Sequence, residues 1–304
     1  MRGLSYVIAL GLAPPASVPD PPLIGYSFSM SGSFHVACVQ NCATGDTGRS
    51  VSECGQLVRD ARSRGADLIC LPEYCAHLHV EGRSFDTGAA PEETHAGLAE
   101  FRSLAASLEA WLLVGSIAIV DEQGNQRNRS LLIDPGGDIT ARYDKIHMFD
   151  VNLSDGEVYR ESDSFKAGDA VVTADTPFAR LGLTICYDPR FAALYRLLAH
   201  NGATVLTVPA AFTYTTGQAH WHVLLRSRAI ETGSYVVAPC QYGYHGAART
   251  YGHSLIVSPW GEILAEGPED EPGVIIAAID PEAVADARSR IPALEHDRPL
   301  SIAN

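Results

Sequence analysis

The segment 181–190, LGLTICYDPR, joins an expected buried strand to the start of an expected helix. Its first five residues form an apolar run typical of a buried strand, and Pro189 favours the first turn of a helix. Cys186 stands at this junction, where a helix N-terminus lowers a thiol pKa and backbone N–H groups stabilise an oxyanion. The segment predicts a nucleophilic cysteine; the alternative is a small buried cysteine, the commonest fate of an isolated one.

Two further segments place a carboxylate and an ammonium in similar surroundings. Glu73 follows the apolar run 67–72, DLICLP, and Lys145 lies within 142–150, RYDKIHMFD. The chain has one other lysine, Lys166, and its remaining cationic side chains are arginines, which favours a requirement for a compact ammonium at residue 145. A carboxylate, an ammonium and a thiol are the groups that a cysteine hydrolase needs, so Glu73, Lys145 and Cys186 together favour this class of enzyme. The alternatives are a capping or ion-paired Glu73 and a surface Lys145.

Strand and helix patterns alternate along the chain. Strands are expected over 34–40, 68–71, 112–120, 130–134, 139–143, 179–186, 204–208, 235–239, 250–258, 262–265 and 274–279. Helices are expected over 51–64, with Ser50 as a cap, and over 92–111, 189–200, 218–232 and 281–288. The long irregular section 147–168 is predicted to be functional or mobile. These elements favour one α/β domain with two sheets between helix layers.

Composition excludes several classes of protein. The 304 residues are 46% apolar and carry a net charge of −14, which argues against nucleic acid and membrane surfaces as partners. The seven cysteines are odd in number and unpatterned, so we expect free thiols in a reducing compartment, the cytoplasm. The sequence contains no P-loop or dinucleotide fingerprint, and we expect no cofactor. Residues 75–79 alternate Cys75, His77 and His79 but lack a fourth ligand at zinc spacing, so we expect no metal.

Residues 1–33 differ from the remainder and are expected to be an N-terminal extension, with the enzyme domain over 34–304. The apolar stretch 4–13 resembles a short signal peptide. Met30 precedes the first strand and is the alternative start, which makes the extension disordered or foreign to the mature protein.

From residue 34 to residue 299 the chain resembles the nitrilase superfamily of carbon–nitrogen hydrolases. The marks are LPE at 71–73, YDKIHMFD at 143–150, CYDPRF at 186–191, HW at 220–221, RSRAIE at 226–231, YGHS at 251–254 and PWG at 259–261. Within the superfamily the chain is most similar to the Nit-type amidases, the branch of deaminated glutathione amidase and ω-amidase. True nitrilases tend to have Trp-Glu after the cysteine, and Tyr187-Asp188 favours an amide substrate instead.

The resemblance implies a four-layer αββα sandwich and a catalytic triad of Glu73, Lys145 and Cys186. Glu161 matches a second glutamate that often joins the triad, and Glu157 is the competing candidate. The chain departs from the family at residues 192–193, at His222, where Glu is usual, and before Pro299, where a second Arg is usual. These departures affect the expected pocket and subunit contacts. We expect a homodimer or a higher homo-oligomer.

The expected reaction is hydrolysis of a small amide to a carboxylic acid and ammonia through a thioester on Cys186. Arg190 is the candidate for binding a substrate carboxylate, because a guanidinium pairs with one bidentately; the alternative is a structural pair with Asp188 or another nearby acidic residue. The Tyr187 N–H is expected at the oxyanion, and the expected pocket walls are Tyr74, Phe149, Ala211 and Phe212. Two other functions stay open, an N-carbamoyl amino acid hydrolase and a catalytically silent scaffold.

Overall fold

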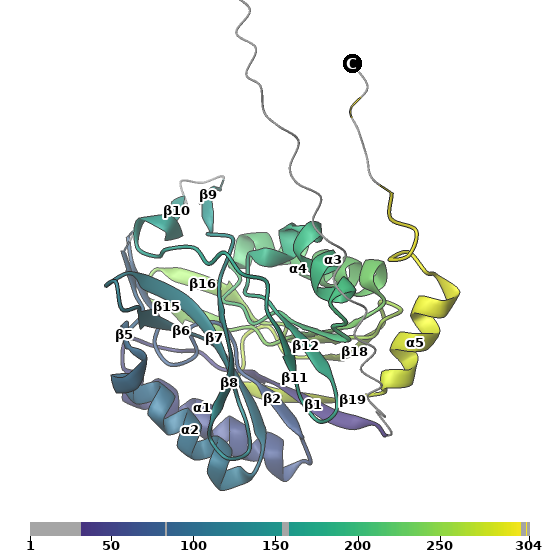
Figure 1. Cartoon of the computed structure of the whole chain (residues 1–304). Coiled ribbons are helices and arrows are strands. Elements are labelled where there is room, and N and C mark those ends of the chain that lie inside the picture. Colours follow the sequence, from purple (N-terminus) through teal and green to yellow (C-terminus); the bar gives the residue numbers. More distant parts are fainter. Residues whose placement is uncertain (1–31, 83, 154–157, 299–301, 303–304) are drawn as a thin grey trace, which may run out of the picture.

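Two β-sheets pack face to face between two layers of helices in the computed structural model (Figure 1). The structure describes residues 32–82, 84–153, 158–298 and 302. The order helix, sheet, sheet, helix is the four-layer αββα sandwich that the resemblance implied. Residues 1–31 and Glu157 lie outside the described part, so the extension over 1–33 stays a prediction.

The first sheet carries the N-terminal half of the chain. Its strand order is β19-β1-β2-β6-β7-β8, with the short β5 beside β6. β1, β2 and β6 are parallel, β19 and β7 run antiparallel to them, and β8 pairs antiparallel with β7. The bounds are β1 (Phe34–Gln40), β2 (Leu68–Cys70), β5 (Ala90–Pro91), β6 (Trp111–Val120), β7 (Gln126–Ile133), β8 (Ile139–Asp144) and β19 (Gly273–Ile279). Helices α1 (Thr47–Ser63) and α2 (Ala96–Leu108) cover its outer face.

The second sheet repeats this plan. Its order is β11-β12-β13-β14-β17-β18, with a parallel trio β12, β13 and β14 at the centre. The bounds are β11 (Thr173–Asp175), β12 (Arg180–Leu183), β13 (Val205–Thr207), β14 (Tyr235–Ala238), β17 (Leu255–Val257) and β18 (Ile263–Glu266). Helices α3 (Ala192–His200) and α4 (Tyr214–Thr232) cover this sheet, and α5 (Pro281–Arg290) lies at the side of the sandwich.

The alternation of side chains along β1 explains why two sheets stack. Val36 and Cys38 point into the core shared with the second sheet, whereas Ala37 and Val39 pack against the layer of α1 and α2. Successive side chains of a strand face opposite sides, so an apolar run with no polar face must be covered on both. This is the physical reason for four layers.

Several helices and strands begin or end at other residues than predicted, for local reasons. Asp46, not Ser50, caps α1 by accepting the Arg49 N–H, while Ser50 is buried and accepts the Thr44 N–H. The expected helix over 92–111 is a 3₁₀ turn, Glu92–Thr94, followed by α2, and residue 111 already begins β6. The expected strand over 250–258 is two strands, because Gly252 and His253 have left-handed φ values of 68° and 51°.

Small hairpins lie near the ends of the large strands. They are β3 (His79–Glu81) with β4 (Ser84–Asp86), β9 (Asp150–Asn152) with β10 (Val158–Arg160), and β15 (Tyr242–His245) with β16 (Ala248–Tyr251). The section 147–168 is therefore less irregular than predicted. All seven cysteines are free, as expected. In the described part of the chain, no helix is long and apolar enough to cross a membrane.

Candidate active site

Glu73, Lys145 and Cys186 come from both sheets and line one cavity. Glu73 follows β2 and Lys145 follows β8 in the first sheet, whereas Cys186 follows β12 in the second. The exposed fractions of the three residues are 2%, 2% and 7%, so all three are withdrawn from bulk solvent. The structure thus brings together the carboxylate, the ammonium and the thiol that three separate sequence segments predicted.

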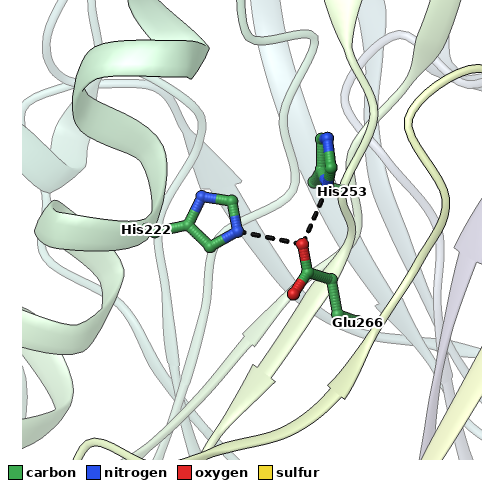
Figure 2. A group of neighbouring side chains, drawn as sticks. All are labelled: His222, His253 and Glu266. Atoms are coloured by element: carbon green, nitrogen blue, oxygen red, sulfur yellow. Dashed lines mark hydrogen bonds and ion pairs between the residues drawn. The ribbon is translucent and has the colours of Figure 1, made fainter.

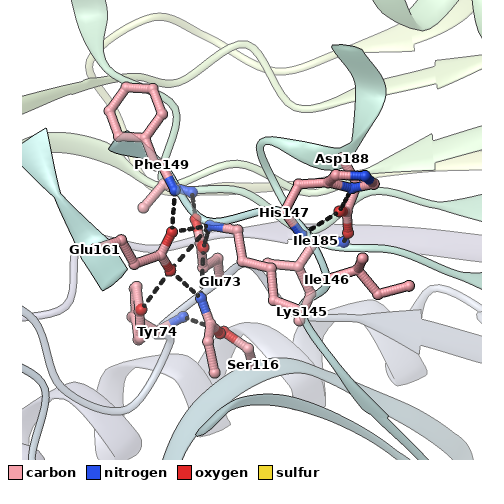
Figure 3. A network of polar contacts seen from close by, with 12 residues as sticks. Glu73, Tyr74, Ser116, Lys145, Ile146, His147, Phe149, Glu161, Ile185 and Asp188 are labelled. Atoms are coloured by element: carbon pink, nitrogen blue, oxygen red, sulfur yellow. Dashed lines mark hydrogen bonds and ion pairs between the residues drawn. The ribbon is translucent and has the colours of Figure 1, made fainter. Parts of the chain in front are cut away.

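Lys145 is held between two carboxylates (Figure 3). Its Nζ donates to Glu73 Oε1 at 2.9 Å and to both carboxylate oxygens of Glu161, at 2.8 and 3.0 Å. Burial by itself would lower the Lys145 pKa, but the charges of Glu161 and Glu73 outweigh burial and hold that pKa well above its usual value. Lys145 is therefore a fixed ammonium at neutral pH.

Glu161 is fixed by the section that connects β8 to the second sheet. It begins a 3₁₀ turn, Glu161–Asp163, directly after β10. Its Oε2 accepts the Phe149 N–H at 2.7 Å, and its Oε1 accepts the Tyr74 hydroxyl at 3.1 Å. Glu161 is 4% exposed, and its carboxylate also accepts the hydrogen bonds from the Lys145 ammonium. These contacts indicate that Glu161 orients Lys145.

Asn128 was not recognised as a site residue from the sequence. It lies on β7, is 1% exposed, and its Nδ2 donates to Glu73 Oε1 at 2.9 Å and to Glu161 Oε1 at 3.0 Å. In the sequence, Asn128 stands out only because residues 128–130, NRS, match the N-glycosylation pattern Asn-X-Ser. A glycan would have to attach to the same Nδ2, which is buried. The signal that could have found Asn128 is weak: a single amide on a strand that faces the site.

We expect Asn128→Ala to lower kcat/KM by roughly 10-fold to 150-fold, since a hydrogen bond to a charged group contributes about 1.5–3 kcal/mol. Ser130→Ala is the matched control, because Ser130 lies on the same strand and donates only to the Val114 carbonyl. Steady-state kinetics of both variants on one amide test this. Equal activity of Asn128→Ala and the unmodified protein would show that Glu73 and Glu161 need no such support.

Cys186 lies on a strained turn. Its φ is 45°, a left-handed value that is costly for a residue with a Cβ and is often found at functional sites. Its own N–H donates to Pro209 O and the Asp188 N–H donates to Ile185 O. The Tyr187 N–H has no acceptor among the described residues, which leaves it available to an oxyanion beside the thiol.

The expected lowering of the thiol pKa is wrong. A short 3₁₀ turn, Asp188–Arg190, follows the cysteine, and α3 begins later than the predicted helix start at Pro189. Burial raises the Cys186 pKa well above its usual value, Glu73 raises it further through its charge and a hydrogen bond, and Lys145 opposes the shift. Cys186 is therefore a neutral thiol at rest and would need a base to act as a nucleophile.

Asp188 fastens the cysteine turn to the strand that leads to Lys145 (Figure 3). It is fully buried and accepts hydrogen bonds from Tyr143 OH at 2.7 Å and Ile185 N at 2.8 Å, and its Oδ1 lies 2.7 Å from His147 Nδ1. Asp188 is thus not the partner of Arg190. Its contacts set the position of the thiol relative to Lys145.

The cavity is small and mostly walled by aromatic and aliphatic side chains. It has a volume of about 50 Å³, well below the roughly 300–1,000 Å³ of pockets for drug-sized ligands. The predicted residues Tyr74, Phe149, Tyr187, Ala211 and Phe212 all line it. The innermost part of the site therefore has room for a compact group next to the thiol.

Arg190 does not line this cavity but lies directly behind two of its walls. Its guanidinium carbon is 5.4 Å from the centroid of the Tyr187 ring and 5.5 Å from that of Phe212. Its Nε is buried without a hydrogen-bond partner among the described residues. Arg249, a cation missed from the sequence, does line the cavity, but Glu269 and Asp270 pair with it at 3.1 and 2.6 Å.

Comparison with known proteins agrees with this geometry. The carbon–nitrogen hydrolase family matches residues 35–289. The chain is 38% identical to the deaminated glutathione amidase of Yersinia enterocolitica over 88% of this chain and 94% of the relative. It is 34% identical to the human omega-amidase NIT2, covering 88% and 95% of the two chains.

A solved structure shows the same architecture. The Caenorhabditis elegans NitFhit protein superimposes with a TM-score of 0.78 at 32% identity, and the match covers 88% of this chain and 65% of that one. The family match spans most of the described chain and includes all three segments that supply Glu73, Lys145 and Cys186. This chain belongs to the carbon–nitrogen hydrolase family.

Proposed function

We propose that this hydrolase cleaves a small carboxylate-bearing amide and that Glu73, Lys145 and Cys186 carry out the reaction. The observation that supports the proposal most is the buried contact of Lys145 with Glu73 in the cavity that also holds the Cys186 thiol. The amidase names of relatives at 38% and 34% identity favour an amide substrate over a nitrile.

In the first step Glu73 takes the thiol proton as the sulfur attacks the amide carbonyl. The raised pKa of Cys186 makes this coupling necessary, because little thiolate exists at rest. Three hydrogen bonds hold the Glu73 carboxylate in place, since its Oε2 accepts the Ala211 N–H at 2.8 Å and its Oε1 accepts from Lys145 and Asn128. A base fixed in this way loses no orientation entropy during the step.

The tetrahedral oxyanion forms next to Lys145 and the Tyr187 N–H. A preorganised donor of this kind contributes about 3–4 kcal/mol in the transition state. Lys145 keeps its charge because of the two carboxylates, and the Tyr187 N–H can bind the oxyanion without first breaking another hydrogen bond to a described residue. Glu73 then passes the proton to the leaving nitrogen, ammonia departs, and Cys186 carries the acyl group as a thioester.

Water completes the reaction by a second round of proton transfers. Glu73 accepts a proton from the attacking water, the thioester carbonyl again develops negative charge beside Lys145, and the thiol leaves with a proton from Glu73. The reaction is split in two because each half has a lower barrier than direct attack of water on the amide. Glu161 contributes by holding Lys145 in place.

Arg190 is the proposed recognition group for the substrate carboxylate. A buried guanidinium N–H without a partner is costly, and a carboxylate that reaches it between Tyr187 and Phe212 would satisfy it. Arg249 also has a buried Nε without a partner among the described residues, but it is the weaker candidate because two acidic side chains already neutralise its charge. The charge that remains available therefore lies behind the wall made by Tyr187 and Phe212.

A pair of amides of equal length tests this proposal. We expect succinamate to be a better substrate than the neutral butanamide, and Arg190→Ala to lower kcat/KM for succinamate by about thirtyfold, the equivalent of about 2 kcal/mol. Butanamide hydrolysis by the same variant should change little. Ammonia release measures both.

Arg249→Ala is the matched control and should not discriminate between the two amides. An equal loss for both amides in Arg190→Ala would mean that Arg190 supports the cysteine turn instead. The N-carbamoyl amino acid alternative is separated in the same assay, because that reaction releases carbon dioxide together with ammonia.

We also propose that the protein is a cytoplasmic homo-oligomer. Val223 and Ile230 are 65% and 52% exposed on α4, and Leu197 on the neighbouring α3 is 51% exposed. Apolar side chains gathered on the outer helix layer favour contact with a second copy. Sedimentation of the purified protein at several concentrations tests the oligomer, and cell fractionation tests the compartment.

A further inference from the structure

Three potential metal ligands meet at one point on the second sheet (Figure 2). His222 comes from α4, His253 from the turn before β17, and Glu266 from the end of β18. Glu266 Oε1 lies 3.0 Å from His222 Nε2 and 2.8 Å from His253 Nδ1. All three ligand atoms lie within 4.8 Å of one another. His222 is also a position where the family pattern usually has Glu.

The arrangement is close to that of a four-coordinate zinc ion. Bonds of about 2.0–2.2 Å to nitrogen and oxygen place tetrahedral ligand atoms roughly 3.3 Å apart. The two measured separations are a few tenths of an ångström shorter, so small side-chain rotations would admit the ion. Two imidazoles and one carboxylate are an established zinc ligand set, with a fourth position left for water.

Both imidazoles present a nitrogen to Glu266 Oε1, and the backbone of His253 is fixed in addition. The Trp221 indole N–H donates to the His253 backbone carbonyl at 2.8 Å, and His253 has a left-handed φ of 51°. His253 Nε2, on the far side of the ring, lies 3.9 Å from Glu269 Oε2. This separation is too long for a hydrogen bond, but it places a negative charge behind the imidazole, which favours binding of a cation on its other side.

Other histidine–carboxylate pairs do not share this geometry. His200 lies 2.9 Å from Asp297 and His147 lies 2.7 Å from Asp188, each without a third ligand. Among the residues that the structure describes, this is the one such group of three. The side chains of His222, His253 and Glu266 are 29%, 21% and 38% exposed, which gives an ion and its water a route from solvent.

We propose that His222, His253 and Glu266 bind one Zn²⁺ ion per chain. Nitrogen-rich ligation favours zinc over the hard cations Mg²⁺ and Ca²⁺, which prefer oxygen. None of the three residues lines the catalytic cavity, so the ion has no part in amide cleavage. It would join α4 to the β17–β18 hairpin and stabilise the folded state by binding to it alone. The expectation of no metal rested on residues 75–79, which take no part in this site.

Calorimetric titration of the metal-free, full-length protein with zinc chloride tests the site. We expect one ion per chain and a higher melting temperature in zinc. Loss of a residue that merely hydrogen-bonds to a metal ligand typically weakens metal binding by ~10–100-fold. His222→Ala removes a ligand itself, so it should weaken zinc binding by at least that much. Glu266→Gln should weaken it similarly with almost no change in shape, and circular dichroism confirms that each variant is folded.

Two controls separate this site from other zinc-binding groups. His200→Ala removes a more exposed histidine with one carboxylate partner and should leave the isotherm unchanged. Cys186→Ala removes the active-site thiol and should retain binding. No zinc binding by the unmodified protein, or binding that survives His222→Ala and Glu266→Gln but disappears in Cys186→Ala, would overturn the proposal. Failure here leaves the amidase proposal intact, since that rests on ammonia release.

Discussion

Cys186→Ala should lower kcat by on the order of 10⁴-fold or more and leave the protein folded. The expected size follows from covalent catalysis: without the sulfur no thioester forms, and the remaining groups stabilise only direct attack by water. The fold should tolerate the change because Cys186 is 7% exposed at a turn and the substitution removes one heavy atom. Ammonia release and circular dichroism of the same sample measure both.

Cys42→Ala provides the matched control. Cys42 is a free, partly buried thiol that does not line the cavity, so its loss should leave turnover unchanged. Rapid quench of the unmodified protein with a slow amide should give an acyl adduct on Cys186 by mass spectrometry. An adduct confined to another cysteine, or near-normal ammonia release by Cys186→Ala, would remove Cys186 from the nucleophile's role.

The three charged or nucleophilic residues were predictable because each carries its signal locally. Glu73 and Cys186 both end apolar runs, and Lys145 is one of two lysines in a chain rich in arginine. A strand end is recognisable without knowing what packs against it. The paired-sheet fold followed from the order of such runs and from the motifs of the superfamily.

The support around these residues was not predictable in the same way. Asn128 reaches Glu73 only because β7 pairs with β8 in one register, and that register depends on the whole sheet. A slip of one residue would turn the amide to the opposite face. The contacts of Asp188 with Tyr143 and His147 likewise join segments that are far apart in sequence.

The direction of the thiol pKa shift was wrong because burial could not be weighed from the sequence. A helix N-terminus was expected to lower the pKa of Cys186, but the turn that follows is too short to have that effect. Burial of the thiol, followed by the charge of the Glu73 carboxylate, dominates the shift of its pKa. A local motif can point to a candidate nucleophile, but the protonation of that group depends on everything packed around it.

Lys145→Arg should reduce kcat/KM by at least ~10³-fold, although the charge is retained. The ammonium fits between Glu73 and Glu161 with heavy-atom distances of 2.8–3.0 Å and is 2% exposed. A planar guanidinium is larger and would displace both the carboxylates and the oxyanion position. Lys166→Arg is the matched control, because Lys166 is exposed and its substitution should leave the kinetics unchanged.

Lys145→Met should in addition destabilise the fold by about 3–5 kcal/mol, since it leaves two buried carboxylates without their cation. In the unmodified protein the raised Lys145 pKa contributes stability that is complete below its unfolded pKa and is lost only at strongly alkaline pH. Urea titrations of the variant and the unmodified protein at one pH measure the loss of stability in the variant.

The double variant Lys145→Met with Glu161→Gln separates the electrostatic role of Lys145 from its catalytic one. Removing one carboxylate relieves the repulsion, so the double variant should regain much of the stability lost by Lys145→Met. The double variant should stay inactive, because without Lys145 it has no ammonium to stabilise the oxyanion. Recovery of activity together with stability would mean that Lys145 serves the fold and that the oxyanion depends on the Tyr187 N–H alone.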